Sequence, residues 1–153
     1  ALQYAGFENG DLQKPFKNDR EVVIAAVSQD GWALQYAGFE NGDLQKPFKN
    51  DREMVMAAVS QDGLALEYAG FENGDLQKPF KNDRVIVMAA VSQDGLALEF
   101  AGFENGDLQK PFKNDRMVVM VAVSQDGYTL RDASEGLRNN PYLSSNVCTK
   151  IPK

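Results

Sequence analysis

The chain repeats itself every 32 residues, and this repetition constrains its fold more than any other property. Four near-identical copies occupy residues 1–32, 33–64, 65–96 and 97–128, and residues 129–153 begin in the same register and then diverge. A unit of 32 residues is too small to bury a hydrophobic core alone, so each copy must be stabilised by packing against its neighbours. We therefore expect an elongated array of four tandem repeats, followed by a divergent C-terminal capping repeat.

The second copy illustrates how one repeat is expected to fold. Asn50 or Asp51 can cap a helix by accepting hydrogen bonds from first-turn amides, and Glu53 is placed to complete a capping box with Asn50. The sequence predicts one helix over Asp51–Gln61 and a second, shorter helix over Leu64–Ala69. Each repeat is thus expected to be a helix pair.

A β-hairpin is the alternative for the same residues. Val22–Val27 and Trp32–Tyr36 are two apolar runs around a glycine, and short apolar runs do not distinguish helix from strand by periodicity. In either fold, Gly63 is expected to supply left-handed or turn geometry. The alanine and methionine content of the longer run and its helix start signal favour helix. The expected fold class is all-α, a helical-repeat solenoid of short helix pairs, with a β-hairpin repeat array as the alternative.

A long segment between the predicted helices is identical in all four copies, whereas the differences lie in or beside the helices. In the first copy it contains the turn signal Asn9-Gly10 and the helix breaker Pro15. Phe7, Leu12 and Phe16 are expected to pin this loop to the body. Loops ordinarily vary more than cores, so the invariant loop is interpreted as constrained by packing or by function.

One helix position changes along the array from charged to apolar. It is Glu21 in the first copy and Glu53 in the second, and it becomes Val85 and then Met117. We expect the C-terminal half of this face to be covered, either by the tail or by a partner, so Met117 is included among the candidate interaction residues.

The stretch Asn18–Ala37 resembles a family of tandem helical repeats, a domain-of-unknown-function family numbered four-one-one-six. The tail segment Ala133–Asn140 has the short link between helices that is typical of that family. The four full copies instead carry a segment that is seven residues longer, Gly6–Phe16 in the first copy. The resemblance implies a helical solenoid and implies no activity, cofactor or functional residue.

Composition argues against several classes of function. The net charge of −6 is spread evenly over the copies, which argues against binding to nucleic acid or to an anionic membrane surface. No apolar stretch is long enough for membrane insertion. The chain has no histidine and a single cysteine, Cys148, and it contains no nucleophile or phosphate-loop motif. We therefore predict that it is not an enzyme and that it needs no cofactor and no metal site.

The expected function is a non-enzymatic scaffold for protein–protein interaction or structural assembly through a periodic loop surface. Loop carboxylates are also the hard oxygen ligands that calcium prefers, so calcium binding or calcium-dependent assembly is the alternative. The partner is expected to be a protein or another copy of the chain, reached in part through an uncapped N-terminal end at Ala1. No targeting signal is visible, so the compartment is unknown, with an intracellular one favoured. The candidate surface residues, besides Met117, are the equivalent phenylalanine, glutamate and aspartate of the four loops: Phe7, Glu8, Asp11, Phe39, Glu40, Asp43, Phe71, Glu72, Asp75, Phe103, Glu104 and Asp107.

Overall fold

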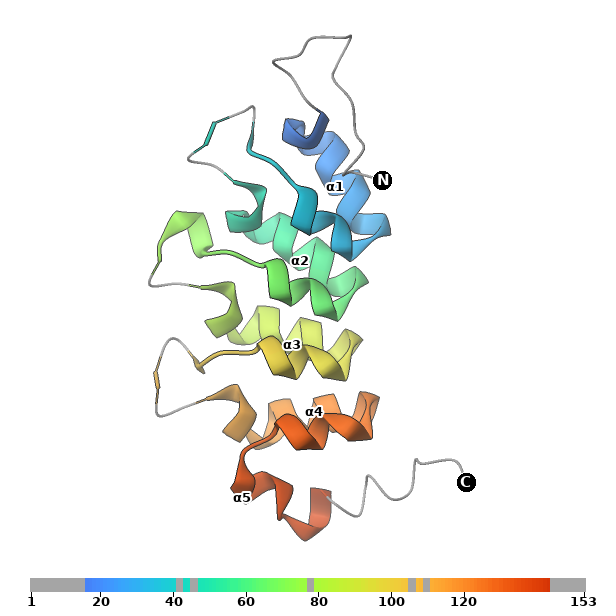
Figure 1. Ribbon diagram of the computed structural model, residues 1–153, viewed down its shortest axis with the longest axis vertical. Helices are drawn as coiled ribbons and strands as arrows, with labels where there is room; N and C mark the ends of the chain where they lie inside the picture. The colour runs from blue at the N-terminus through green and yellow to red at the C-terminus, as the bar shows by residue number, and fades with distance from the viewer. Residues whose placement is uncertain are drawn as a thin grey trace.

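The computed structural model describes residues 16–40, 43–44, 47–76, 79–104, 107–108 and 111–143. Four α-helices of equal length recur at the repeat spacing, and they are α1 Arg20–Gln29, α2 Arg52–Gln61, α3 Arg84–Gln93 and α4 Arg116–Gln125. Each is followed by a six-residue 3-10 segment: η4 Gly31–Tyr36, η7 Gly63–Tyr68, η10 Gly95–Phe100 and η13 Gly127–Asp132. Figure 1 shows these units stacked along the long axis. The expected all-α solenoid of short helix pairs is confirmed.

The N-cap residue of each of these four α-helices is an aspartate, not the asparagine that precedes it. In α2, Oδ1 of Asp51 accepts hydrogen bonds from the backbone N–H groups of Glu53 and Met54, at 2.9 and 3.2 Å. With Asp51 as the N-cap, Glu53 lies one position too early to close a capping box. The predicted capping box with Asn50 is therefore wrong, whereas the predicted helix is correct to within one residue.

The β-hairpin alternative is wrong for the described residues. Val22–Val27 lies within α1, and Trp32–Tyr36 lies within η4. Between them, Asp30 closes one element and opens the next: its backbone N–H donates to the carbonyl of Ala26, and its Oδ1 accepts from the N–H of Trp32 at 3.0 Å. The second segment was expected to be the shorter helix of each pair. It is helical, and its six residues form the tighter 3-10 turns that are common in short helices.

The elements form two layers that run the length of the array. Each α-helix packs against the α-helix of the next copy, and each long 3-10 segment packs against its equivalent in the next copy. The 3-10 layer faces the viewer in Figure 1, with the α-helices behind it. Buried valines, alanines and leucines of both layers, such as Val59, Ala65 and Leu66, form one continuous core between them. None of the described helices is long and apolar enough to cross a membrane.

A glycine at the start of η4, η7 and η10 allows the copies to approach closely. A Cβ at Gly63 would overlap the carbonyl oxygen of Ala90 in the next copy and lie 3.0 Å from the backbone nitrogen of Asp94. Gly31 and Gly95 meet the carbonyls of Ala58 and Ala122 in the same way. Among the described residues, positive φ occurs only at Asn73 and Gly74. The expectation that Gly63 supplies left-handed geometry is thus wrong, and its role is backbone contact between copies.

The divergent tail keeps part of the repeat pattern. The N–H of Ser134 donates to the carbonyl of Lys113 at 2.7 Å, and its hydroxyl donates to Oδ1 of Asn114 at 2.7 Å. A single-turn helix, α5 Glu135–Arg138, follows against η13. Leu143 is buried against the core just beyond it. The tail therefore covers part of the last copy with a shorter structure than the loop of the full repeats.

Candidate interaction surface

The described parts of the long segments project from one edge of the array, at the left in Figure 1. We call this edge the loop edge, meaning the described residues of 38–47, 70–79 and 102–111. Each loop begins and ends at an isolated antiparallel bridge, which in the third copy joins Phe71 and Pro79. At its tip, Asn73 and Gly74 have φ angles of 49° and 76°. This confirms the expected Asn-Gly turn in the third copy, because asparagine and glycine tolerate positive φ best. Asn9-Gly10, the pair of the first copy, lies outside the described residues.

The base of each loop is fastened to the preceding copy. The N–H of Gly70 donates to the carbonyl of Lys49 at 2.8 Å, and the N–H of Phe71 donates to Oδ1 of Asn50 at 3.0 Å. A Cβ at Gly70 would overlap the Asn50 side chain, so only glycine fits at this contact. The same bonds recur at Gly38 and Gly102. Asn50 thus anchors a loop instead of capping a helix, which explains why it precedes the cap in every copy.

The apolar side chains of the loops divide into a buried set and an exposed set. The phenylalanines that follow the loop proline are buried in the second, third and fourth copies, and they are Phe48, Phe80 and Phe112. Phe16, their equivalent in the first copy, is half-buried. The loop leucines are instead 75, 75 and 72% exposed, at Leu44, Leu76 and Leu108. The expectation that the leucine pins the loop is wrong in these three copies. Its equivalent in the first copy, Leu12, lies outside the described residues.

Each loop is also held by an arginine of the preceding copy. In the middle of the array, Nη1 of Arg52 lies 2.7 Å from Oδ2 of Asp83 and 3.5 Å from Oε1 of Glu72. Arg84 makes the equivalent contacts with Asp115 and Glu104. The N-cap aspartate therefore has two roles, with one oxygen on its own helix and the other on the neighbouring arginine. We call this recurrent arrangement the arginine clamp.

The first clamp has one more carboxylate than the others. Arg20 contacts Asp51 and Glu53 at 2.6 Å each, with Glu40 at 4.0 Å. At the Glu53 position the third and fourth copies have Val85 and Met117. At the other end of the array, Arg116 makes no ion pair with any residue that the structure describes. The clamp thus joins successive full copies, and residues 129–143, the described part of the tail, do not continue it.

The clamp shifts the ionisation of its members. Hydrogen bonds to Asp51 and Glu53 raise the pKa of Arg20 above its usual range. Burial of Asp51 opposes its ionisation, but the hydrogen bonds from Arg20 and from the Met54 amide outweigh burial, so the pKa of Asp51 is lowered. Asp83 and Asp115 have pKa values lowered for the same reasons. All three aspartates are therefore ionised at neutral pH.

The structure gives different roles to the candidate residues of the loop edge. Glu40, Glu72 and Glu104 lie in the arginine clamp, partly shielded from solvent. The equivalent phenylalanines are half-buried at the loop base, and the equivalent aspartates are exposed at the loop tip: Phe39, Phe71, Phe103, Asp43, Asp75 and Asp107. Phe7, Glu8 and Asp11, with the N-terminal end at Ala1, lie outside the described residues. The exposure of the loop leucines was not predicted from the sequence. The one sequence signal for this was the position of each leucine beside a predicted turn.

Met117 lies at the start of α4 and is 62% exposed, so none of the described residues covers it. Val85 is exposed in the same way. The cover that was expected from the tail is absent among residues 129–143. Cover by a partner stays a prediction.

The part of the chain that the structure describes contains no cluster of side chains suited to binding a metal ion. No group of three or more histidine, cysteine, aspartate or glutamate side chains there could hold a metal ion. The loop glutamates that were considered as calcium ligands face arginines instead, which oppose a cation at that point. Calcium binding by the loops stays a prediction.

Comparison with known proteins finds one family to which part of the chain is similar. Residues 1–41 and 46–73 match the sequence model of a family described as a domain of unknown function (DUF4116). Searches of curated proteins and of solved structures found no match. The matched segments contain α1, α2 and the 3-10 segments that follow them. The resemblance noted from the sequence is confirmed there, and the chain is a tandem helical-repeat protein with units similar to DUF4116.

Proposed function

We propose that this array is a non-enzymatic scaffold that binds a protein partner along the loop edge. The observation that carries the proposal is the row of exposed leucines, Leu44, Leu76 and Leu108, one in each described loop. These large apolar side chains recur on one edge and cover none of the core. Exposed apolar side chains in such an arrangement are typical of interaction sites. A partner that spans several copies would bury all three.

The anchoring of the loops supports this proposal. Backbone hydrogen bonds to the preceding copy, the buried phenylalanine and the arginine clamp hold each loop at a fixed place. A pre-ordered binding surface loses less conformational entropy on association than a mobile one. Repetition adds avidity, because engagement of one loop raises the effective concentration of the partner at the next.

Site-specific photocrosslinking tests the proposal. A benzophenone amino acid replaces Leu44, Leu76 or Leu108 in separate variants. A fourth variant carries it at Ser60, an exposed residue near the C-terminal end of α2, the opposite end from the loop-anchoring Asn50. We expect a discrete crosslinked protein from the three loop positions and none from Ser60. A crosslinked product of twice the mass of the chain would identify another copy as the partner. Equal yields at the three leucine positions and at Ser60 would contradict binding through the loop edge.

The calcium alternative needs a separate measurement. Calorimetric titration with calcium, and melting curves with and without a chelator, detect ions bound by the native chain. The scaffold proposal predicts no heat of binding and an unchanged melting temperature. Saturable heat and a higher melting temperature would instead favour calcium-dependent assembly.

A further inference from the structure

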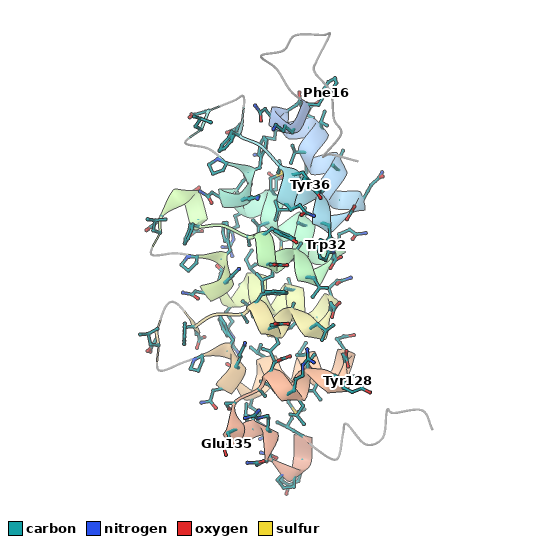
Figure 2. The ribbon with its side chains drawn as sticks, in the orientation of Figure 1. Phe16, Trp32, Tyr36, Tyr128 and Glu135 are labelled. Carbon is teal, nitrogen blue, oxygen red and sulfur yellow. The ribbon has the colours of Figure 1, made fainter. Side chains whose placement is uncertain are left out.

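The 3-10 layer presents aromatic side chains along the outer face of the array. Trp32 and Tyr36 are exposed on η4 and Tyr128 on η13, while Tyr68 and Phe100 are partly exposed between them. The rings of Trp32 and Tyr68 pack edge to face, with centroids 5.6 Å apart. Figure 2 shows Trp32, Tyr36 and Tyr128 on the side where the 3-10 segments lie. We call these five residues the aromatic face.

Carboxylates accompany these rings at both ends of the 3-10 segments. Asp30, Asp62, Asp94 and Asp126 each cap a segment through one oxygen, which accepts a backbone N–H at 2.8–3.0 Å. Glu67 and Glu99 are exposed near the other end. None of these six carboxylates forms an ion pair with the lysines and arginines that the structure describes.

The two sides of the array therefore differ in charge compensation. At the loop edge, Arg20, Arg52 and Arg84 neutralise the carboxylates of the next copy. Beside the aromatic face, the carboxylates have no such partner among the described residues. The pKa of Tyr68 is raised by desolvation, by the negative charge of Glu67 and by a hydrogen bond to Glu67.

We propose that the aromatic face, with its flanking carboxylates, binds an arginine-containing segment of a partner protein. A guanidinium group stacks on aromatic rings and pairs with carboxylates, and this face offers both groups side by side. Three of the rings are exposed and two are partly exposed, so a ligand can reach them without rearrangement of the core. The site is separate from the loop edge and does not depend on the function proposed for that edge.

The only tryptophan of the chain, Trp32, lies on this face and reports binding there. A heptapeptide of arginine is titrated into the full chain at 0.15 M salt, and Trp32 emission and the anisotropy of the labelled peptide are both recorded. We expect saturable binding that changes Trp32 emission. A heptapeptide of glutamate should not bind.

Charge-matched variants locate the site. The double variant Glu67→Gln and Glu99→Gln removes two carboxylates beside the rings, and Glu21→Gln with Glu135→Gln removes two exposed carboxylates elsewhere. Both change the net charge from −6 to −4, by the loss of two negative charges. We expect the first to weaken peptide binding by roughly twofold to thirtyfold, the range for two exposed ion pairs. The second should change it by less than about twofold, because distant charges are screened at this salt.

The rings are tested in the same way. Tyr36→Leu should weaken binding by about twofold to fivefold, since it removes a ring from the face, whereas Tyr142→Leu, at an exposed tyrosine beyond α5, should not. Absence of peptide binding would overturn the proposal, and so would binding that leaves Trp32 emission unchanged. Equal losses in the two charge-matched variants would also overturn it, because they would show attraction to net charge alone.

Discussion

Replacing Gly63 with alanine should weaken the contact between the second and third copies. The added Cβ would overlap the carbonyl oxygen of Ala90 and press on the backbone nitrogen of Asp94. Both neighbours are backbone atoms of α3 and its cap, so neither can rotate away. The shift would also disturb the hydrogen bond from the Gly63 N–H to Oε1 of Gln93, at 2.6 Å.

The size of the effect follows from these contacts. Overpacking a close contact costs about 1–3 kcal/mol, and a weakened hydrogen bond adds about 0.5–1.5 kcal/mol. Alanine restricts the unfolded chain and returns about 0.4–1 kcal/mol. We therefore expect the Gly63→Ala variant to be less stable by roughly 0.5–4 kcal/mol, which lowers the melting temperature by about 1–16 °C.

Gly136→Ala is the matched control, because a Cβ at Gly136 meets nothing within 4 Å. In the helix α5 this substitution should leave stability unchanged or raise it by up to about 1 kcal/mol. Urea unfolding followed by far-ultraviolet circular dichroism measures both variants. Equal stability of the Gly63→Ala and Gly136→Ala variants would refute the close-approach role of this glycine.

Three further predictions concern the clamp and the core. The clamp aspartates have pKa values below the usual 3.8, and they are Asp51, Asp83 and Asp115. Their contribution to stability is therefore complete above about pH 4 and is lost as the pH falls through their folded pKa values. The melting temperature should fall accordingly between about pH 7 and pH 2, and a melting temperature independent of pH below about 4 would contradict this. Arg52→Gln should lower the free energy of unfolding in urea by about 0.5–1.5 kcal/mol, a value reduced by the partial exposure of the ion pair with Asp83. Arg116→Gln should change it by less than about 0.5 kcal/mol, because Arg116 has no ion-pair partner among the described residues. Equal losses in the two variants would argue against the clamp. Phe80→Ala should cost about 3–5 kcal/mol because Phe80 is fully buried, and a loss below about 1 kcal/mol would show that the loop base contributes little to the core.

Local signals in the sequence predicted the helices well. The predicted helix Asp51–Gln61 corresponds to α2 Arg52–Gln61, because the cap, the apolar run and the glycine stop are all encoded within a dozen residues. The second segment was predicted over Leu64–Ala69 and is found at Gly63–Tyr68. Its 3-10 geometry could not be predicted, because a short apolar run does not distinguish an α-helix from the tighter 3-10 helix.

The candidate surface could be predicted only in part, because its key contacts join different copies. Glu72 was interpreted as an exposed loop carboxylate, and its partner Arg52 lies 20 residues earlier, in the preceding copy. Leu76 and Phe80 are both apolar loop residues, yet one is exposed and the other buried. Hydrophobicity alone therefore does not distinguish the exposed loop residue from the buried one.

The central claim is that the array is built from copies whose stability comes from contacts with adjacent copies. Removing residues 65–96 deletes one full period and joins Leu64 to Ala97, a junction equivalent to that between Leu64 and Ala65. We expect this shortened chain to fold with the same helix content per residue by circular dichroism, and with a cooperative but lower melting transition. Removing residues 65–80 deletes half a period and should disrupt the helices around the junction. Loss of helical structure in the in-phase deletion, or equal behaviour of the two deletions, would contradict the account.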